Sequence, residues 1–173
     1  MNKSIKKLLI ILLSVIIFII VTVAIWFFFF RTNDVILIKK VINNAVDLSL
    51  KRQGDNIVFN TVAHNNTPKY FAEKTQFNFG HGGFSGSLST AEITANLGRL
   101  KAVVNEIIPK IGTIDVTVSS DKKSAKAYFP AVVSGVVKTG GRFREARDVD
   151  CSLIKTEQGW RINSLQFRPV LQR

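Results

Sequence analysis

The longest apolar stretch of the chain lies near its N-terminus, over residues 8–30. It contains no charged residue, and only Ser14 and Thr22 interrupt it with polar side chains. At about 1.5 Å per residue, a helix of this length spans roughly 34 Å, which is enough for the hydrocarbon core of a bilayer. Trp26 suits the interface with the headgroups at the far end. The pattern predicts one transmembrane helix over residues 8–30.

The charges on either side of this stretch predict its orientation. Three lysines lie in residues 1–7, whereas Arg31 and Asp34 nearly cancel just after it. We therefore expect a cytoplasmic N-terminus, an inner or plasma membrane location and an extracytoplasmic domain, which would be periplasmic in a Gram-negative cell. The alternative is a secretory signal cleaved near Ala24. Cleavage there would leave an apolar mature terminus, which favours the anchor.

Residues 31–173 are long enough for one soluble domain. Apolar residues at helical spacing predict a first helix from Asn33 or Asp34 to about Lys51. Further along, polar, aromatic and glycine-rich segments predict, in order, a loop or short helix at 54–67, a helical turn and short strand at 70–79, and a loop at 81–87.

A second long helix is predicted to begin at Thr90. Ser89 and Glu92 have the spacing of a capping box, in which each side chain satisfies a backbone N–H of the first turn. Apolar residues continue at helical spacing beyond residue 100. We expect this helix to continue until Pro109 and Gly112 stop it.

The remainder of the chain has the alternation of half-buried strands, separated by turn residues. The predicted strands are Thr113–Val118, Ser124–Val137, Arg142–Ile154 and Gly159–Pro169. Helices followed by a four-stranded antiparallel meander predict an α+β domain with its helices packed on one face of the sheet.

This order of elements resembles the nuclear-transport-factor-2-like superfamily, also called SnoaL-like. The resemblance rests on the long first helix, the aromatic segment 70–79, the capped helix, the long strands and a final strand that begins Gly159-Trp160-Arg161-Ile162. It implies a cone-shaped, cystatin-like fold, in which a curved antiparallel sheet wraps around N-terminal helices and encloses a pocket. Because the superfamily includes enzymes and non-catalytic members, the resemblance implies a fold rather than an activity.

Charge and composition limit the classes of partner and cofactor that we expect for this chain. The chain has 24 Lys and Arg against 12 Asp and Glu, and without the three lysines of residues 1–7 the domain still carries about +9. Such a domain would attract anionic lipid. The basic residues are scattered and form no reading motif, so we expect no nucleic-acid partner. Two histidines and one cysteine predict no metal site and no cofactor, with Cys151 buried in a strand.

The pocket implied by the resemblance suggests candidate site residues. His81 in the glycine loop and Asp148 on a strand are the candidates for acid-base chemistry. The structural alternative is an exposed loop histidine and surface ion pairs of Asp148 and Asp150 with nearby arginines. Candidates for ligand binding are Tyr70, Phe79, His81, Tyr128, Glu145 and Arg147.

Two functions follow from these patterns. The first is a membrane-anchored, extracytoplasmic, non-catalytic module that binds a partner protein or a small ligand. The alternative is a membrane-tethered SnoaL-type enzyme that uses His81 and Asp148 on a small molecule. The second hypothesis requires both side chains to face one cavity. The resemblance also implies a homodimer through the sheet.

Overall fold

The computed structural model describes residues 16–22, 34–55, 66–80 and 83–170. Contacts divide the chain into two compact units, Met1–Ile36 and Leu37–Arg173. In the first unit, residues 16–22 form a helix with exposed apolar side chains. Among the described residues, no helix combines the length and the apolar character that a bilayer span requires. Most of the predicted transmembrane stretch, residues 8–30, lies outside the described residues.

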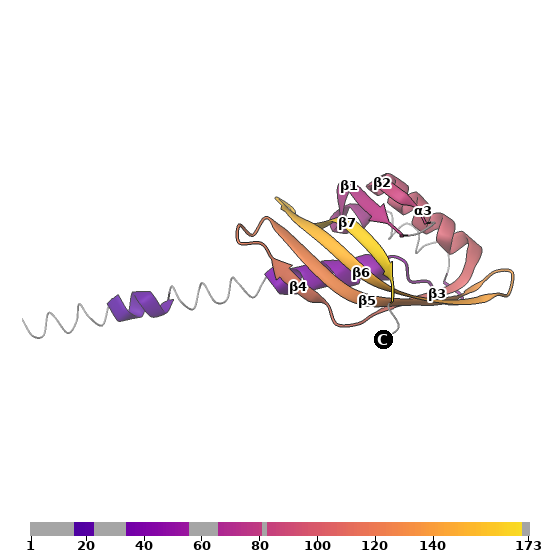
Figure 1. The fold of residues 1–173 in the computed structure, drawn as a ribbon, viewed down its shortest axis with the longest axis horizontal. Coiled ribbons are helices and arrows are strands. Elements are labelled where there is room, and N and C mark those ends of the chain that lie inside the picture. Colours follow the sequence, from indigo (N-terminus) through magenta and orange to yellow (C-terminus); the bar gives the residue numbers. More distant parts are fainter. Residues whose placement is uncertain (1–15, 23–33, 56–65, 81–82, 171–173) are drawn as a thin grey trace, which may run out of the picture. The chain divides into compact units, whose positions relative to one another are not determined.

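The second unit is built on one seven-stranded sheet (Figure 1). Its strands are β1 (Phe71–Asn78), β2 (Ser85–Ser89), β3 (Val104–Ile111), β4 (Asp115–Val118), β5 (Ser124–Val137), β6 (Arg142–Thr156) and β7 (Gly159–Pro169). The strand order is β2-β1-β7-β6-β5-β3, and β4 also pairs with β5. Every pair is antiparallel except β1 with β7, which is parallel. The sheet is therefore mixed, within the expected α+β class.

One face of this sheet is apolar and forms the core. In β5 and β6 the buried side chains alternate with exposed or half-buried ones, as a sheet with a single covered face requires. Residues 37–47 of the helix 34–47 supply Ile38 and Ile42, which are almost fully buried. They belong to the same apolar cluster as Val149, Leu153 and Trp160 of the sheet. Helix and sheet thus bury each other's apolar faces.

Several predicted elements are confirmed. The first helix begins at residue 34, although it ends at 47 rather than near Lys51. α3 (Thr90–Val103) begins at the predicted residue, and both halves of its capping box are present. β5 and β7 have the predicted bounds, and β6 is two residues longer than predicted. Strong local signals, a cap or a long alternating run, account for this agreement.

The predicted end of the second helix is wrong. α3 stops at Val103, and the following residues form β3, which pairs with β5. The ammonium of Lys51 donates hydrogen bonds to the carbonyls of Lys101 and Val104, both at 2.6 Å. A cation at this position satisfies carbonyls that a helix leaves free at its C-terminus. Pro109 is tolerated because β3 is an edge strand.

The glycine-rich loop at 81–87 is shorter than predicted, and the sheet is larger. Residues from Ser85 onward form β2, which pairs with β1. β1 in turn lies beside β7, so the predicted meander of four antiparallel strands gives way to a mixed sheet of seven. The alternation within one segment carries no information about a partner strand almost 90 residues away, so this pairing could not be predicted.

Gly135 permits the close approach of β3 to β5. A Cβ atom added there would lie 2.3 Å from the carbonyl oxygen of Glu106 and 2.8 Å from the ring of Phe143. The register of β3 against β5 shifts at this point, between Val104 and Glu106. Any side chain at position 135 would push the edge strand away.

The capping box makes a prediction about stability. Ser89→Ala removes the acceptor of the Glu92 N–H, whose hydrogen bond is 3.3 Å long, and should lower the free energy of unfolding by about 1 kcal/mol. Denaturant unfolding of the full chain would measure it. Ser87→Ala, at an exposed position of β2, is the matched control and should shift stability by under about 0.5 kcal/mol. Equal losses in both variants would contradict the role of the cap.

The same cap should depend on pH. Hydrogen bonds from the backbone and side chain of Ser89 lower the pKa of the Glu92 carboxyl in the folded protein. A group with a lowered folded-state pKa stabilises the fold above its unfolded pKa, and this contribution disappears as the pH falls through the folded-state pKa. The stability difference between the wild-type chain and Glu92→Gln should therefore shrink on acidification through the carboxyl range. A constant difference would exclude the carboxylate as its source.

Cys151 provides a probe of the core. Burial raises the pKa of its thiol to about 12. At pH 8 the thiolate is therefore only about one part in ten thousand of the folded protein, so we expect no reaction with a thiol reagent in native conditions. Reaction should appear in parallel with unfolding in denaturant. Rapid labelling of the native chain would show that the sheet opens locally around β6.

Candidate functional site

A cavity of about 180 Å³ lies between residues 42–49, which form the end of the helix 34–47 and the turn after it, and the apolar face of the sheet. The helix side contributes Ile42, Ala45, Val46 and Ser49. The sheet side is lined by residues of β1, β3, β5, β6 and β7, namely Phe71, Pro109, Lys110, Ile111, Phe129, Ala131, Val133, Val149, Ile162, Leu165 and Phe167. We call this space the first cavity. Its walls are almost entirely apolar, and the described lining contains no carboxylate and no histidine.

Glu145 and Arg147 form an ion pair beside the first cavity. They alternate with the buried Val149 on β6 and so share its face of the sheet. Arg147 stands opposite Ala131 in β5, and Glu145 stands opposite Val133. Both of these β5 residues line the cavity. The sequence placed this pair on the apolar stripe, and the structure places it at the edge of the cavity wall.

Asp148 and Tyr128 lie together on the other face of the sheet. Tyr128 alternates with the buried Ala127 and Phe129, and Asp148 alternates with the buried Val149. A hydrogen bond to Asp148 is the main cause that raises the pKa of the Tyr128 hydroxyl. On the same face, Asp150 and Arg168 form an ion pair at 2.5 Å. These polar side chains satisfy one another on the face opposite the first cavity.

The remaining candidate residues lie apart. Tyr70 is half-buried against the core, in the short helix 66–70. Phe79 follows β1 and is 43% exposed. His81 lies outside the described residues. Of the candidates that the structure describes, Glu145 and Arg147 stand opposite lining residues of the first cavity, and Phe79 stacks on another lining residue, Phe167.

A second cavity, of about 310 Å³, lies between α3 and the strands β1 and β2. Its lining comprises Phe77, Phe79, Phe84, Leu88, Ile93, Asn96, Leu97 and Leu100. Asn96 is the only polar residue among these. The capped start of α3 holds the helix over this part of the sheet, so the cavity depends on the same cap that sets the helix boundary.

Stacked phenylalanines occupy the boundary between the two cavities. Phe79, which lines the second cavity, stacks on Phe167, which lines the first, with ring centroids 4.5 Å apart. Phe77 and Phe79 also stack, at 6.3 Å. The parallel pairing of β1 with β7 places Phe77 opposite Leu165. At this end of the strand pair, Phe77 thus faces the second cavity and Leu165 faces the first, whereas Phe71, earlier in β1, lines the first cavity.

Sequence reasoning missed most of this lining. Pro109 and Ile111 were assigned to a helix end, whereas they line the first cavity from β3. The density of β-branched residues between 103 and 111 was the available signal for a strand. Leu165 and Phe167 could be assigned to one face of β7, but nothing local shows which cavity that face borders.

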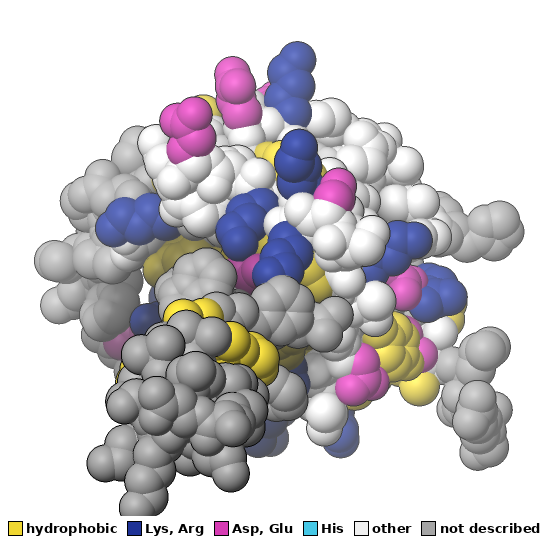
Figure 2. Space-filling view, turned by 90° about the vertical axis from the view of Figure 1, so that its left-hand side faces the viewer, with side chains coloured by type: hydrophobic (Ala, Val, Ile, Leu, Met, Phe, Trp, Pro, Cys, Tyr) yellow, Lys and Arg dark blue, Asp and Glu magenta, His cyan; other side chains and the backbone are white. Residues whose placement is uncertain are grey.

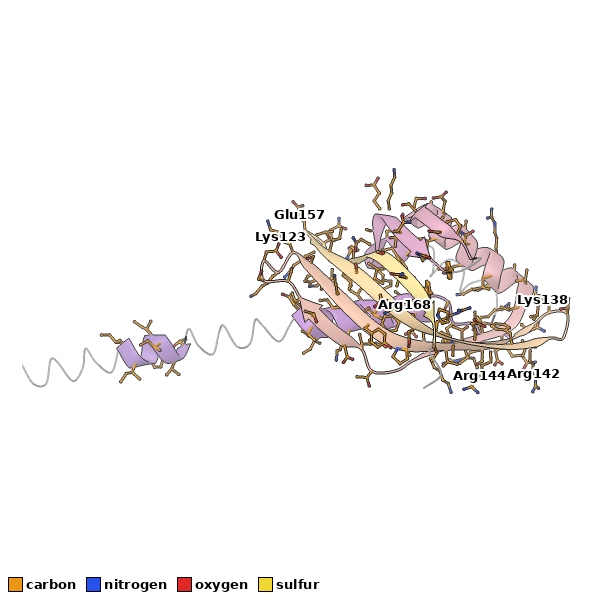
Figure 3. The ribbon with its side chains drawn as sticks, in the orientation of Figure 1. Lys123, Lys138, Arg142, Arg144, Glu157 and Arg168 are labelled. Carbon is orange, nitrogen blue, oxygen red and sulfur yellow. The ribbon has the colours of Figure 1, made fainter. Side chains whose placement is uncertain are left out.

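Basic side chains lie at several places on the described surface. Figure 2 shows Lys and Arg interspersed with Asp and Glu over the face it presents. Figure 3 shows Lys138, Arg142 and Arg144 at one end of the long strands, and Lys123 and Glu157 at the other. Within the described residues no group of three or more His, Cys, Asp or Glu side chains could hold a metal ion.

No protein-family model and no curated protein matches this sequence. Solved structures do match the fold. A protein from Kribbella flavida has a TM-score of 0.67 at 14% identity, over 83% of this chain and 95% of that one. An NTF2-like protein with a cystatin-like fold from Novosphingobium aromaticivorans has a TM-score of 0.63 at 17% identity, over 83% and 86%.

A third similar structure, also from Novosphingobium aromaticivorans, is provisionally named a scytalone dehydratase. Its TM-score is 0.64 at 8% identity, over 83% of this chain and 97% of that one. Identities this low establish the arrangement of elements and nothing of the chemistry. The helices, the mixed sheet and these likenesses together show that the domain has the nuclear-transport-factor-2-like, cystatin-like fold.

Proposed function

We propose that the protein is a membrane-anchored, extracytoplasmic, non-catalytic module whose domain binds a small, largely apolar ligand in the first cavity. The observation that carries this proposal is the chemistry of the cavity wall. Its described lining offers apolar contact over nearly the whole surface and no titratable pair for proton transfer. Burial of apolar ligand surface, at about 25 cal/mol per Å², would supply most of the affinity.

The edge of the cavity offers one polar contact. The Arg147 guanidinium is about 37% exposed and is paired with Glu145. A ligand with an anionic or hydrogen-bonding end could bind this guanidinium and leave its apolar part against Ala131 and Val133. Because a guanidinium presents several N–H donors, it can bind a ligand oxygen and keep its bond to Glu145.

The alternative is a SnoaL-type enzyme that uses His81 and Asp148. The provisional name of one similar structure is consistent with it at the level of fold alone. Asp148 points to the face opposite the first cavity and is hydrogen-bonded to Tyr128. A general base must reach the proton that it removes, so this position favours binding over acid-base catalysis in the first cavity.

The anchor in the proposal rests on the apolar stretch 8–30 and on the lysines that precede it. The first domain helix begins at residue 34, only a few residues after this stretch. A tether of that length would keep the domain close to the bilayer and would suit a component that receives its ligand, or meets a partner, at the membrane.

Binding in the first cavity can be tested with a light-activated probe. The full chain in lipid nanodiscs is exposed to octanoate that carries a terminal diazirine, and labelled tryptic peptides are mapped. We expect label in peptides 41–51 and 127–138, which carry the cavity residues of the helix and of β5. Absence of label from both peptides would contradict the proposed function.

A pair of matched variants sharpens this test. Ala131→Phe places a ring in the first cavity and should reduce labelling about tenfold, whereas Ala146→Phe, exposed on the opposite face, should leave it unchanged. Thermal unfolding of both variants checks that the fold is retained. Equal labelling in the two variants would place the bound probe elsewhere.

Membrane attachment has its own test. The wild-type chain should remain in the membrane fraction after an alkaline wash. Ile17→Asp with Ile20→Asp should release it, since each charge costs about 2.5–3.5 kcal/mol at the centre of a spanning helix. Val35→Asp with Ile36→Asp, beyond the apolar stretch, is the control and should stay in the membrane fraction. Release of the wild-type chain by the wash would exclude an integral anchor.

A further inference from the structure

We propose that the two cavities form one site, which binds a single long acyl chain with its carboxylate near Arg147 and its tail under α3. This inference rests on the proposed function and deepens it, because it names the class of ligand. The proposed function places a small ligand in the first cavity alone. Here the ligand is longer and extends across the boundary between β7 and β1 into the second cavity.

The first argument is position. Both cavities lie against the apolar face of the same sheet, since Phe77 and Leu165 are neighbours across the parallel pair and line one cavity each. The stacked rings of Phe79 and Phe167 stand at the same boundary. The stacked side chains of Phe79 and Phe167 therefore occupy the boundary on this face.

The second argument is size. The first cavity, at about 180 Å³, is smaller than the roughly 300–1,000 Å³ of typical ligand pockets, whereas the second, at about 310 Å³, is already in that range. Each cavity has an almost purely apolar wall. A flexible methylene chain needs only a narrow opening between two apolar spaces, whereas a rigid ring system needs a wide one.

The third argument is that the boundary can open. The ring of Phe79 is 43% exposed, so it can turn toward solvent without displacing core side chains. Gly80, the next residue, has a φ of +77°, and a Cβ there would lie 3.3 Å from the carbonyl oxygen of Phe167. The glycine lets the chain turn away directly after Phe79.

The fourth argument is polarity. Val149 stands opposite Phe167, which carries one of the stacked rings, and Arg147 stands opposite Pro169. Arg147 is therefore two residues from Val149 on β6, on the same face of the sheet as the rings. The ion pair of Glu145 with Arg147 adjoins the lining of the first cavity, whereas that of Asp150 with Arg168 lies on the other face of the sheet. A carboxylate at Arg147 would direct the chain along the first cavity and past Phe167.

The test compares two probes on the full chain in lipid nanodiscs. Octanoate and hexadecanoate, each with a terminal diazirine, are crosslinked separately and the labelled residues are mapped. We expect octanoate to label peptides 41–51 and 127–138, and hexadecanoate to label α3 around Ile93 and Leu97, within peptide 75–99. Label from hexadecanoate only in the first cavity would overturn the single-site proposal and leave the proposed function intact. Label from neither probe would remove both.

Matched variants exclude labelling through the surface of α3. Leu97→Trp fills the second cavity and should reduce hexadecanoate labelling of α3 about tenfold, with octanoate labelling of the first cavity unchanged. Ala95→Trp, exposed on the same helix and outside the cavity lining, should change neither. Thermal unfolding checks that both variants fold. If Leu97→Trp leaves the α3 label unchanged, the tail binds outside the second cavity and the proposal falls.

Discussion

The sheet of this protein has one apolar face, and the need to remove that face from water determines the rest of the domain. Ile38 and Ile42 of the helix 34–47 meet the inward-facing residues of β6 and β7, and Trp160 is buried in the same cluster. The apolar surface buried in this way provides the main free energy that opposes the loss of chain entropy on folding. The outer face carries ion pairs and hydrogen bonds instead, such as Asp150 with Arg168.

Two helices cover the apolar face incompletely, and the cavities are the result. The helix 34–47 covers the long strands, and α3 covers β1 and β2. Close packing normally leaves few voids larger than a water molecule. Here both cavities lie where a helix meets the sheet, and aromatic rings from β1 and β7 occupy the boundary. The same arrangement that gives the core its stability therefore leaves the space in which a ligand could bind.

Local signals predicted much of this fold. The capping box fixed the start of α3, and long alternating runs gave β5 and β7 their bounds. The stretch from Val104 to Ile111 fits both a helical and a strand period, and the carbonyls at the helix end before it accept hydrogen bonds from Lys51, some 50 residues earlier in the chain. The pairing of β1 with β7 had no local signal. Likewise Glu145 and Arg147 could be placed on the apolar face, but the cavity beside them involves β3, which was assigned to a helix.

The place of β7 in the sheet has a consequence for how the chain folds during synthesis. β7 is the last strand in the sequence, yet it lies in the interior of the sheet, between β1 and β6. β1 and β2 can form a hairpin early, but they join the long strands only through β7, which is synthesised after all the other strands of the sheet. Contacts of such high sequence separation slow folding, because a long loop must close before they form. Until then the edge of β1 that pairs with β7 has no partner strand, so the complete sheet depends on this eleven-residue strand.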